Sequence, residues 1–242
     1  MCSEGGFLMK YQLNPHIYVF GKAIRTPKIS ITFLSYLLLG KQNILIDTVP
    51  YKAAEAYIKD LASVLPLTKL DGIILNHSEE DHSGALGTVL EKAGDVPIYC
   101  TEAAKDRIGE RYPSADFRPV ADGSSLTLGD YTFRFIHTPG LHWPDNMVTW
   151  LESESMLFSN DLFGQYLAED PPVEGALSDE DILAGSKPYF EKVFRSSTHE
   201  ERSVILDITD LPIRTLAPGH GLVLRKRWPA LRDYYREEAV KE

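Results

Sequence analysis

Cysteine is nearly absent from this chain of 242 residues, which contains only Cys2 and Cys100. Two cysteines cannot form the dense disulfide framework of a small secreted domain, and these two do not form a Cys-x-x-Cys pair. The cysteine content therefore favours a reducing environment, and we expect a cytoplasmic protein.

Long apolar runs are also missing. The longest apolar stretch, residues 31–39, is interrupted by Thr32 and Ser35 and is too short to span a bilayer. The first ten residues lack the apolar segment of an export signal. The sequence therefore predicts neither a membrane anchor nor an export signal.

Positive charge is in deficit, since 25 Lys and Arg residues stand against 35 Asp and Glu residues and give a net charge of −10. This balance argues against a nucleic-acid backbone or an anionic membrane as the main partner. Hydrophobic residues make up 43% and charged residues 25%, as in ordinary globular proteins, so disorder is not expected. We expect one large domain over residues 1–242.

Short β-rich runs alternate with helical segments along the chain. Strands are predicted at residues 17–20, 31–39, 43–47, 72–75, 96–100, 125–128, 131–136, 147–151, 156–158, 204–206 and 214–216. Helices are predicted at residues 51–65, 82–92, 101–110, 179–194 and 228–239. This order suits two β layers with helices outside them, an α+β arrangement.

Four strong metal donors lie close together directly after the strand predicted at 72–75. Residues two apart in extended backbone point to the same side, so His77, Glu79 and Asp81 can converge, and His82 can join them from the start of the next helix. The alternative is a polar loop that caps this helix, because acidic residues are favoured near a helix N-terminus.

Three later donors, His142, Asp161 and His220, each follow a predicted strand. Loops at strand ends meet at one edge of a sandwich, so these donors can join the first four. Four imidazoles and three carboxylates suit two metal ions better than one, with a hydroxide completing the bridge. Mixed nitrogen and oxygen donors suit iron, manganese or zinc, and the share of carboxylates favours iron.

The order of these donors resembles the metal signature of the metallo-β-lactamase superfamily, which implies an αββα sandwich of two mixed β-sheets flanked by helices. Hydrolases of the superfamily have His where this chain has Glu79, and they lack a residue corresponding to Leu141 before the second His of the His-Thr-Pro-Gly-His motif. Both departures resemble the diiron domain of flavodiiron proteins. Segments 141–145 and 159–165 are also similar to that branch, and the resemblance covers most of residues 30–225.

The resemblance implies a ligand set for two non-haem iron ions joined by an oxide or hydroxide. One iron would be held by His77, Glu79 and His142, the other by Asp81, His82 and His220, and Asp161 would bridge them. Asp47 occupies the place of an acid that orients ligands in the superfamily. A turn residue after a strand is the equal alternative for Asp47.

Other residues near these motifs are weaker candidates. Trp143, Phe163 and Tyr166 could line the pocket beside the metals or could be ordinary core aromatics. Gln165 could donate a hydrogen bond to a bound ligand. We expect His137 to be structural, because the family pattern uses the second histidine of its segment.

Flavodiiron proteins continue into a flavodoxin-like domain that binds FMN, and we expect neither this domain nor FMN in a chain that ends at Glu242. The sequence is most similar to flavin-free oxygen-binding diiron proteins, which implies O2 sensing, binding or scavenging through a diferric-peroxo form. The alternative is an O2 or NO reductase that takes electrons from a separate flavoprotein or rubredoxin. A metal-dependent hydrolase is less favoured, because of Glu79 and Leu141. A signalling partner and a homo-oligomer are further expectations.

Overall fold

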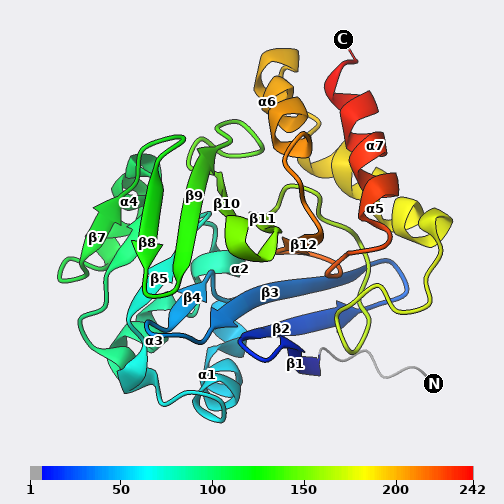
Figure 1. Cartoon of the computed structure of the whole chain (residues 1–242). Coiled ribbons are helices and arrows are strands. Elements are labelled where there is room, and N and C mark those ends of the chain that lie inside the picture. The colour runs from blue at the N-terminus through cyan, green and yellow to red at the C-terminus, as the bar shows by residue number, and fades with distance from the viewer. Residues whose placement is uncertain (1–6, 242) are drawn as a thin grey trace.

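The computed structural model describes residues 7–241, which form two β-sheets packed face to face with helices on both outer sides (Figure 1). Helices α1 and α3 lie outside the first sheet, and α5, α6 and α7 lie outside the second. The expected α+β fold, an αββα sandwich of two mixed β-sheets flanked by helices, is therefore confirmed.

The first sheet has seven strands in sequence order, antiparallel from β1 to β4 and parallel from β4 to β7. They are β1 (Phe7–Asn14), β2 (Ile17–Arg25), β3 (Ser30–Leu38), β4 (Ile44–Ile46), β5 (Gly72–Ile74), β6 (Ile98–Cys100) and β7 (Phe117–Pro119). The connecting helices are α1 (Ala54–Ala62), α2 (Glu80–Ser83), α3 (Leu86–Ala93) and α4 (Glu102–Ile108), with short 3₁₀ turns at Tyr51–Ala53, Leu67–Lys69 and Gly109–Arg111.

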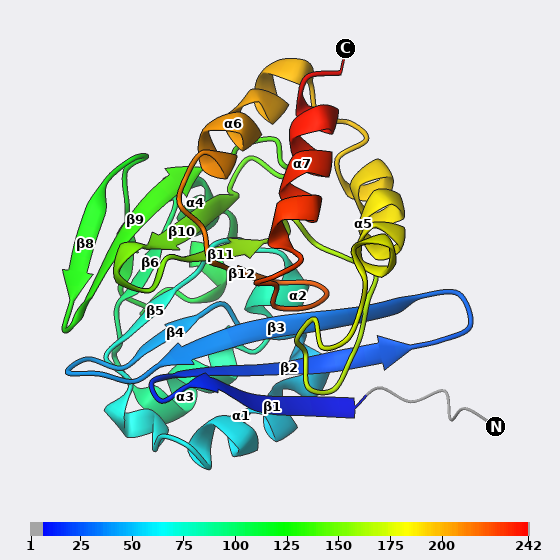
Figure 2. The ribbon, with the colours of Figure 1, turned by 45° about the vertical axis from the view of Figure 1, so that its right-hand side comes forward.

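The second sheet has five strands in the order β12-β11-β10-β9-β8, and only the β11–β12 pair is parallel. They are β8 (Ser125–Leu128), β9 (Tyr131–His137), β10 (Met147–Leu151), β11 (Met156–Asn160) and β12 (Thr215–Pro218), with a 3₁₀ turn at Glu152–Glu154. Helices α5 (Asp179–Val193), α6 (His199–Thr209) and α7 (Trp228–Ala239) stand together over this sheet (Figure 2).

The main hydrophobic core lies between the two sheets and includes Tyr36 of β3 and Phe158 of β11, whose rings meet at 5.2 Å. Strand β9 shows why the sequence folds this way. Tyr131, Phe133 and Phe135 are buried and alternate with exposed residues, which is the period of two expected of a strand with one face on a core.

The strand predicted at residues 204–206 is wrong, because these residues lie inside helix α6. Thr198 and Glu201 form a capping box that starts the helix, and the apolar residues that follow recur at helical spacing, with Ile205 and Ile208 buried. A run of three apolar residues does not distinguish a strand from a helix by itself.

Two further differences concern unpredicted strands and a divided helix. Strands β1 and β7 were not predicted, and the helix predicted at 82–92 is split into α2 and α3. The break follows from a tertiary contact, since the Ala85 amide donates to the Val49 carbonyl instead of continuing the helical ladder.

Among residues 7–241, no helix combines the length and apolar character needed to cross a bilayer.

Replacement of Phe133 with Ala should lower the free energy of unfolding by about 3–5 kcal/mol, because it removes a fully buried ring between the sheets. Urea denaturation monitored by circular dichroism measures this loss. Its neighbour Arg134 is exposed on the same strand, and Arg134→Ala should change stability by no more than about 0.5 kcal/mol. Equal losses for the two variants would contradict the assignment of this core.

Candidate metal centre

Seven donor side chains, far apart in sequence, meet at one edge of the sandwich. His77 and Glu79 follow β5, two donors lie on α2, His142 lies in the β9–β10 connection, and the last two follow β11 and β12. The complete cluster consists of His77, Glu79, Asp81, His82, His142, Asp161 and His220. In all four histidines, Nε2 faces the carboxylates.

One half of the cluster surrounds Oδ2 of Asp161. This oxygen lies 3.6 Å from Nε2 of His77 and 3.2 Å from Nε2 of His142. Oε2 of Glu79 lies 3.3 Å and 3.4 Å from the same two nitrogens. This half therefore offers two imidazoles, one terminal carboxylate and one oxygen of Asp161.

The other half surrounds Oδ1 of Asp161, which lies 3.0 Å from Nε2 of both His82 and His220. The two oxygens of Asp81 lie 3.6 Å from Nε2 of His82 and 3.4 Å from Nε2 of His220. The same donor types are thus repeated, and Asp161 turns one oxygen to each half.

These separations fit two cations. Donors bonded to one ion at 2.0–2.2 Å lie roughly 3.0–3.5 Å from one another, close to the distances between the donors here. Oδ1 of Asp81 and Oδ2 of Asp161 are buried without a hydrogen-bond partner in the described part of the chain. A buried carboxylate oxygen without a donor is costly, and a bound cation would satisfy it.

The cluster is closed on one side and open on the other. The side chains of His77 and His82 are fully buried, and that of Asp161 is 3% exposed. Exposure rises to 35% for Glu79, 25% for Asp81 and 23% for His142. A small molecule can therefore approach from the side of these three residues.

The carboxylates and imidazoles shift one another's pKa values strongly. Burial by itself lowers the pKa of His77, but its hydrogen bonds with carboxylates outweigh burial and raise this pKa to about 10. The same balance raises the pKa of His220 to about 10. Hydrogen bonds with His142 and His77 lower the pKa of Glu79 to about 2. Protons and metal cations therefore compete for the same nitrogen atoms.

Asp47 connects two of the chain segments that carry donors. Its Oδ1 accepts from the Asn76 amide at 2.7 Å, and its Oδ2 accepts from the side chains of Asn76 at 3.0 Å and Asn160 at 3.1 Å. Asn76 precedes His77 and Asn160 precedes Asp161. Asp47 and Asn160 both have left-handed backbone, with φ of 55° and 49°. This geometry favours the orienting role over a simple turn residue.

His220 is oriented by a residue that sequence reasoning missed. Its Nδ1 lies 2.7 Å from the carbonyl oxygen of Thr32, whose hydroxyl also bonds to the backbone of Gly221. Thr32 stood out in the sequence only as a polar break in the apolar run of β3. Thr32 is completely buried, and this polar residue interrupts the apolar strand where it contacts His220 and Gly221.

The weaker candidates divide between the site and the core. The Trp143 ring lies 5.0 Å from the His77 ring, whereas Phe163 packs against Trp228 in the core. Tyr166 is half-buried, and its ring lies 5.2 Å from that of Tyr189. The Tyr189 hydroxyl, which the sequence did not single out, donates to Oδ1 of Asp161 at 3.4 Å.

Gln165 bonds within the protein through both ends of its side chain, and a hydrogen bond to a bound ligand stays a prediction. Its side-chain nitrogen donates to the Phe163 carbonyl at 2.6 Å, and its side-chain oxygen accepts from the Leu222 amide at 2.9 Å. Gln165 therefore braces the loops after β11 and β12. His137 lies outside the cluster, with Nε2 3.1 Å from the Val120 carbonyl, as expected of a structural residue.

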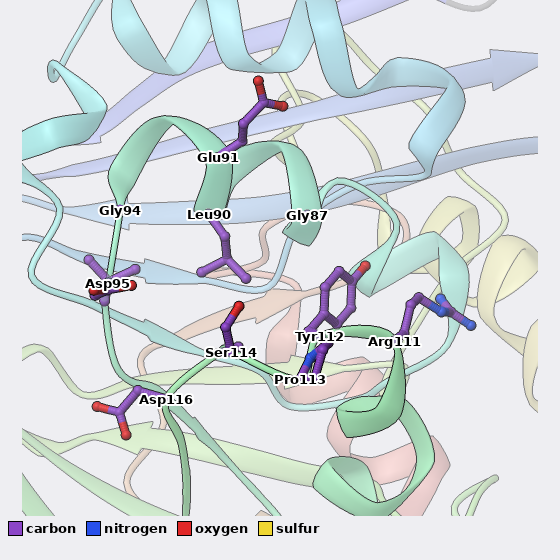
Figure 3. Close-up of a pocket in the computed structure, with 12 residues that line it drawn as sticks. Gly87, Leu90, Glu91, Gly94, Asp95, Arg111, Tyr112, Pro113, Ser114 and Asp116 are labelled. Carbon is purple, nitrogen blue, oxygen red and sulfur yellow. The ribbon is translucent and has the colours of Figure 1, made fainter.

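A separate surface cavity of about 330 Å³ lies between α3 and the segment that leads to β7 (Figure 3). Leu90 and the ring of Tyr112 face this hollow, whereas Arg111 points away from it. Its lining residues lie between positions 87 and 116 and include none of the seven donors. This cavity is therefore distinct from the candidate metal centre.

Comparison with known proteins gives a family match and close relatives. Residues 31–221 match a family model described as "ODP family beta lactamase". The "Anaerobic nitric oxide reductase flavorubredoxin" of Salmonella typhi is 35% identical over 214 residues, which cover 86% of this chain and 45% of that protein. The protein of the same name from Vibrio vulnificus is 33% identical over 209 residues, with 84% and 42% covered. This chain thus spans less than half the length of these curated relatives.

Solved structures show the same fold. A single-residue mutant of the flavo di-iron protein from Thermotoga maritima matches with a TM-score of 0.84 and 31% identity, over 96% of this chain and 61% of that chain. The flavodiiron protein from Giardia intestinalis matches with a TM-score of 0.88 over 96% of this chain and 60% of that chain. At 24% identity, the second likeness concerns the fold alone.

Replacement of Asp47 with Ala should weaken metal binding by about 10- to 100-fold, because the segments before His77 and Asp161 lose their common acceptor. Metal titration of the metal-free protein measures this loss. Asp47→Asn retains an acceptor oxygen and should lose less. Asp130→Ala, at an exposed ion pair with Lys41, is the control and should bind metal normally. Unchanged metal affinity in Asp47→Ala would rule out the orienting role.

Proposed function

Because this chain belongs to the family described as ODP family beta lactamase, we propose that its seven donors hold two non-haem iron ions in the diiron domain of an O2 or NO reductase. His77, Glu79 and His142 would hold one ion, and Asp81, His82 and His220 the other. The iron pair would supply two exchangeable electrons and a binding place for a diatomic molecule.

The observation that carries this proposal is the position of Asp161. Each of its oxygens faces two imidazole nitrogens and is close to one further carboxylate, so the donor set is divided evenly between two ions. Two thiolate-free positions of this kind suit iron, manganese or zinc, and the share of carboxylates favours iron. The carboxylate at Glu79 also distinguishes the chain from the histidine pattern of the hydrolases.

The surrounding residues keep the donors in place and control access. Asp47 and Thr32 hold the segments that carry His77, Asp161 and His220. The Tyr189 hydroxyl donates to Asp161 from the buried side. Glu79, Asp81 and His142 lie on the exposed side, from which a small substrate would approach.

Electron counting favours a reductase that works with a donor. Reduction of O2 to water takes four electrons, and reduction of NO to N2O takes one per NO, whereas two ferrous ions supply two. The names of the curated relatives describe anaerobic nitric oxide reductases that are flavorubredoxins, which supports this reading over O2 sensing. Residues 7–241 form only the two-sheet domain. In this proposal the domain receives its electrons from a flavin or rubredoxin held outside it.

Protein produced in iron-rich medium should contain about two irons per chain, as the two sets of donors require. Replacement of Asp161 with Ala should remove both irons together, because each half loses an oxygen. Metal analysis after desalting measures the content. Glu79→Ala and Asp81→Ala should each affect mainly one half. Loss of a single iron in Asp161→Ala, or a zinc-only protein with esterase turnover, would overturn the diiron assignment.

Donor-supported turnover separates the reductase from an O2-binding sensor. The iron-loaded protein, mixed anaerobically with a reduced flavoprotein and rubredoxin, should consume NO or O2 continuously, as measured with a gas electrode. Asp161→Ala should show only the background rate. Uptake of O2 that stops after one equivalent, with no effect of added donor, would instead support a binding or sensing role.

A further inference from the structure

The two halves of the cluster differ in what lies behind their imidazoles. Nδ1 of His77 lies 3.2 Å from Oδ2 of Asp145, a charged carboxylate. Nδ1 of His220 lies 2.7 Å from a neutral backbone carbonyl, that of Thr32. Nδ1 of His82 is buried and has no hydrogen-bond partner within residues 7–241. Of these three imidazoles, only that of His77 is therefore supported by a carboxylate.

Asp145 is held rigidly in this position. Its side chain is fully buried, and the Ser78 amide donates to the same oxygen, Oδ2, at 2.8 Å. The Thr101 hydroxyl donates to the Asp145 carbonyl at 3.0 Å and fixes its backbone. The carboxylate therefore cannot turn away from His77 without breaking several contacts.

A cation partly compensates the charge of Asp145. Nε of Arg107 lies 3.7 Å from Oδ1 of Asp145, beyond hydrogen-bond distance, and Oδ1 is one of the buried oxygens without a partner in the described residues. The guanidinium carbon of Arg107 lies 4.1 Å from the centre of the Trp143 ring, which in turn meets the His77 ring at 5.0 Å. The Arg107 side chain is 40% exposed, so solvent screens its charge.

We propose that Asp145 is a positioning residue that makes the half of the centre around His77 the tighter metal-binding half, and that Arg107 limits this effect. This inference rests on the proposed function. A carboxylate behind a histidine fixes the tautomer that leaves Nε2 free and strengthens Nε2 as a donor, whereas a neutral carbonyl does so less. Asp145 also adds a negative charge near this half, which attracts a cation.

Titration of the metal-free full chain with Co2+, followed by visible absorption in competition with a chelator, tests the inference. The unmodified protein should show two classes of affinity. Asp145→Ala should weaken the tighter class by about 10- to 100-fold and leave the other nearly unchanged. Asp145→Asn keeps an acceptor without the charge and should recover part of the loss. If Asp145→Ala fails to fold, Asp145→Asn carries the test, with a smaller loss confined to the same class.

Two variants, each lacking a ligand of one half, show which half of the centre has the Co2+ affinity that Asp145→Ala weakens. In Asp81→Ala, which leaves the donors around His77, the added change Asp145→Ala should still weaken Co2+ binding. In Glu79→Ala, which leaves the other half, the added change should have no further effect. The reverse pattern, or equal weakening of both classes together with a lower melting temperature of the metal-free protein, would show a merely structural role and overturn the inference.

Arg107→Gln removes the compensating charge and should tighten the same class by about three- to tenfold. Arg118→Gln breaks an exposed ion pair with Asp116 and is the matched control, expected to change neither class. Two Co2+ ions bound with equal affinity, unaltered by changes at Asp145, would refute the asymmetry and leave the proposed function standing. Failure of the unmodified chain to bind two ions at all would instead remove the proposed function.

Discussion

The candidate metal centre depends on one buried carboxylate, that of Asp161. Asp161 lies among four imidazoles with both oxygens withdrawn from water, and an unpaired carboxylate in such a place is strongly unfavourable. Burial raises its pKa, but the surrounding imidazoles outweigh burial and lower this pKa well below the usual range. The ionised form is therefore stable only while positive charge surrounds it, supplied by protonated histidines or by metal ions. The rest of the structure keeps this charge cluster assembled.

The sandwich assembles the cluster because it brings several strand ends to one edge. β5 belongs to the first sheet, and β11 and β12 belong to the second, so donors from both layers meet only when the layers pack. Asp47, at the end of β4, crosses between the layers by binding Asn76 and Asn160. The hydrophobic core between the sheets, with Phe133 and Phe158 buried, thus supports the geometry of a polar site at its edge. A metal ion bound here would therefore be coupled to the stability of the fold.

The two halves have the same types of donor, but the groups behind their imidazoles differ. Asp145 stands behind His77, a neutral carbonyl stands behind His220, and Nδ1 of His82 has no partner in the described chain. Such differences in the surroundings tune metal ions that have identical ligands.

The sequence alone determined the sandwich class, most strands and the seven side chains that meet at the candidate centre, because periodicity and His and carboxylate spacing are local properties that also carried the family resemblance. It failed where local pattern was ambiguous, as at residues 204–206, where a capping box and packing against the second sheet make a helix of a strand-like run. Contacts such as His77 with Asp145, His220 with Thr32 and Tyr189 with Asp161 join residues 68, 188 and 28 positions apart. Only the tertiary structure decided them, because the partner and direction of a polar side chain depend on how the two sheets close over the site.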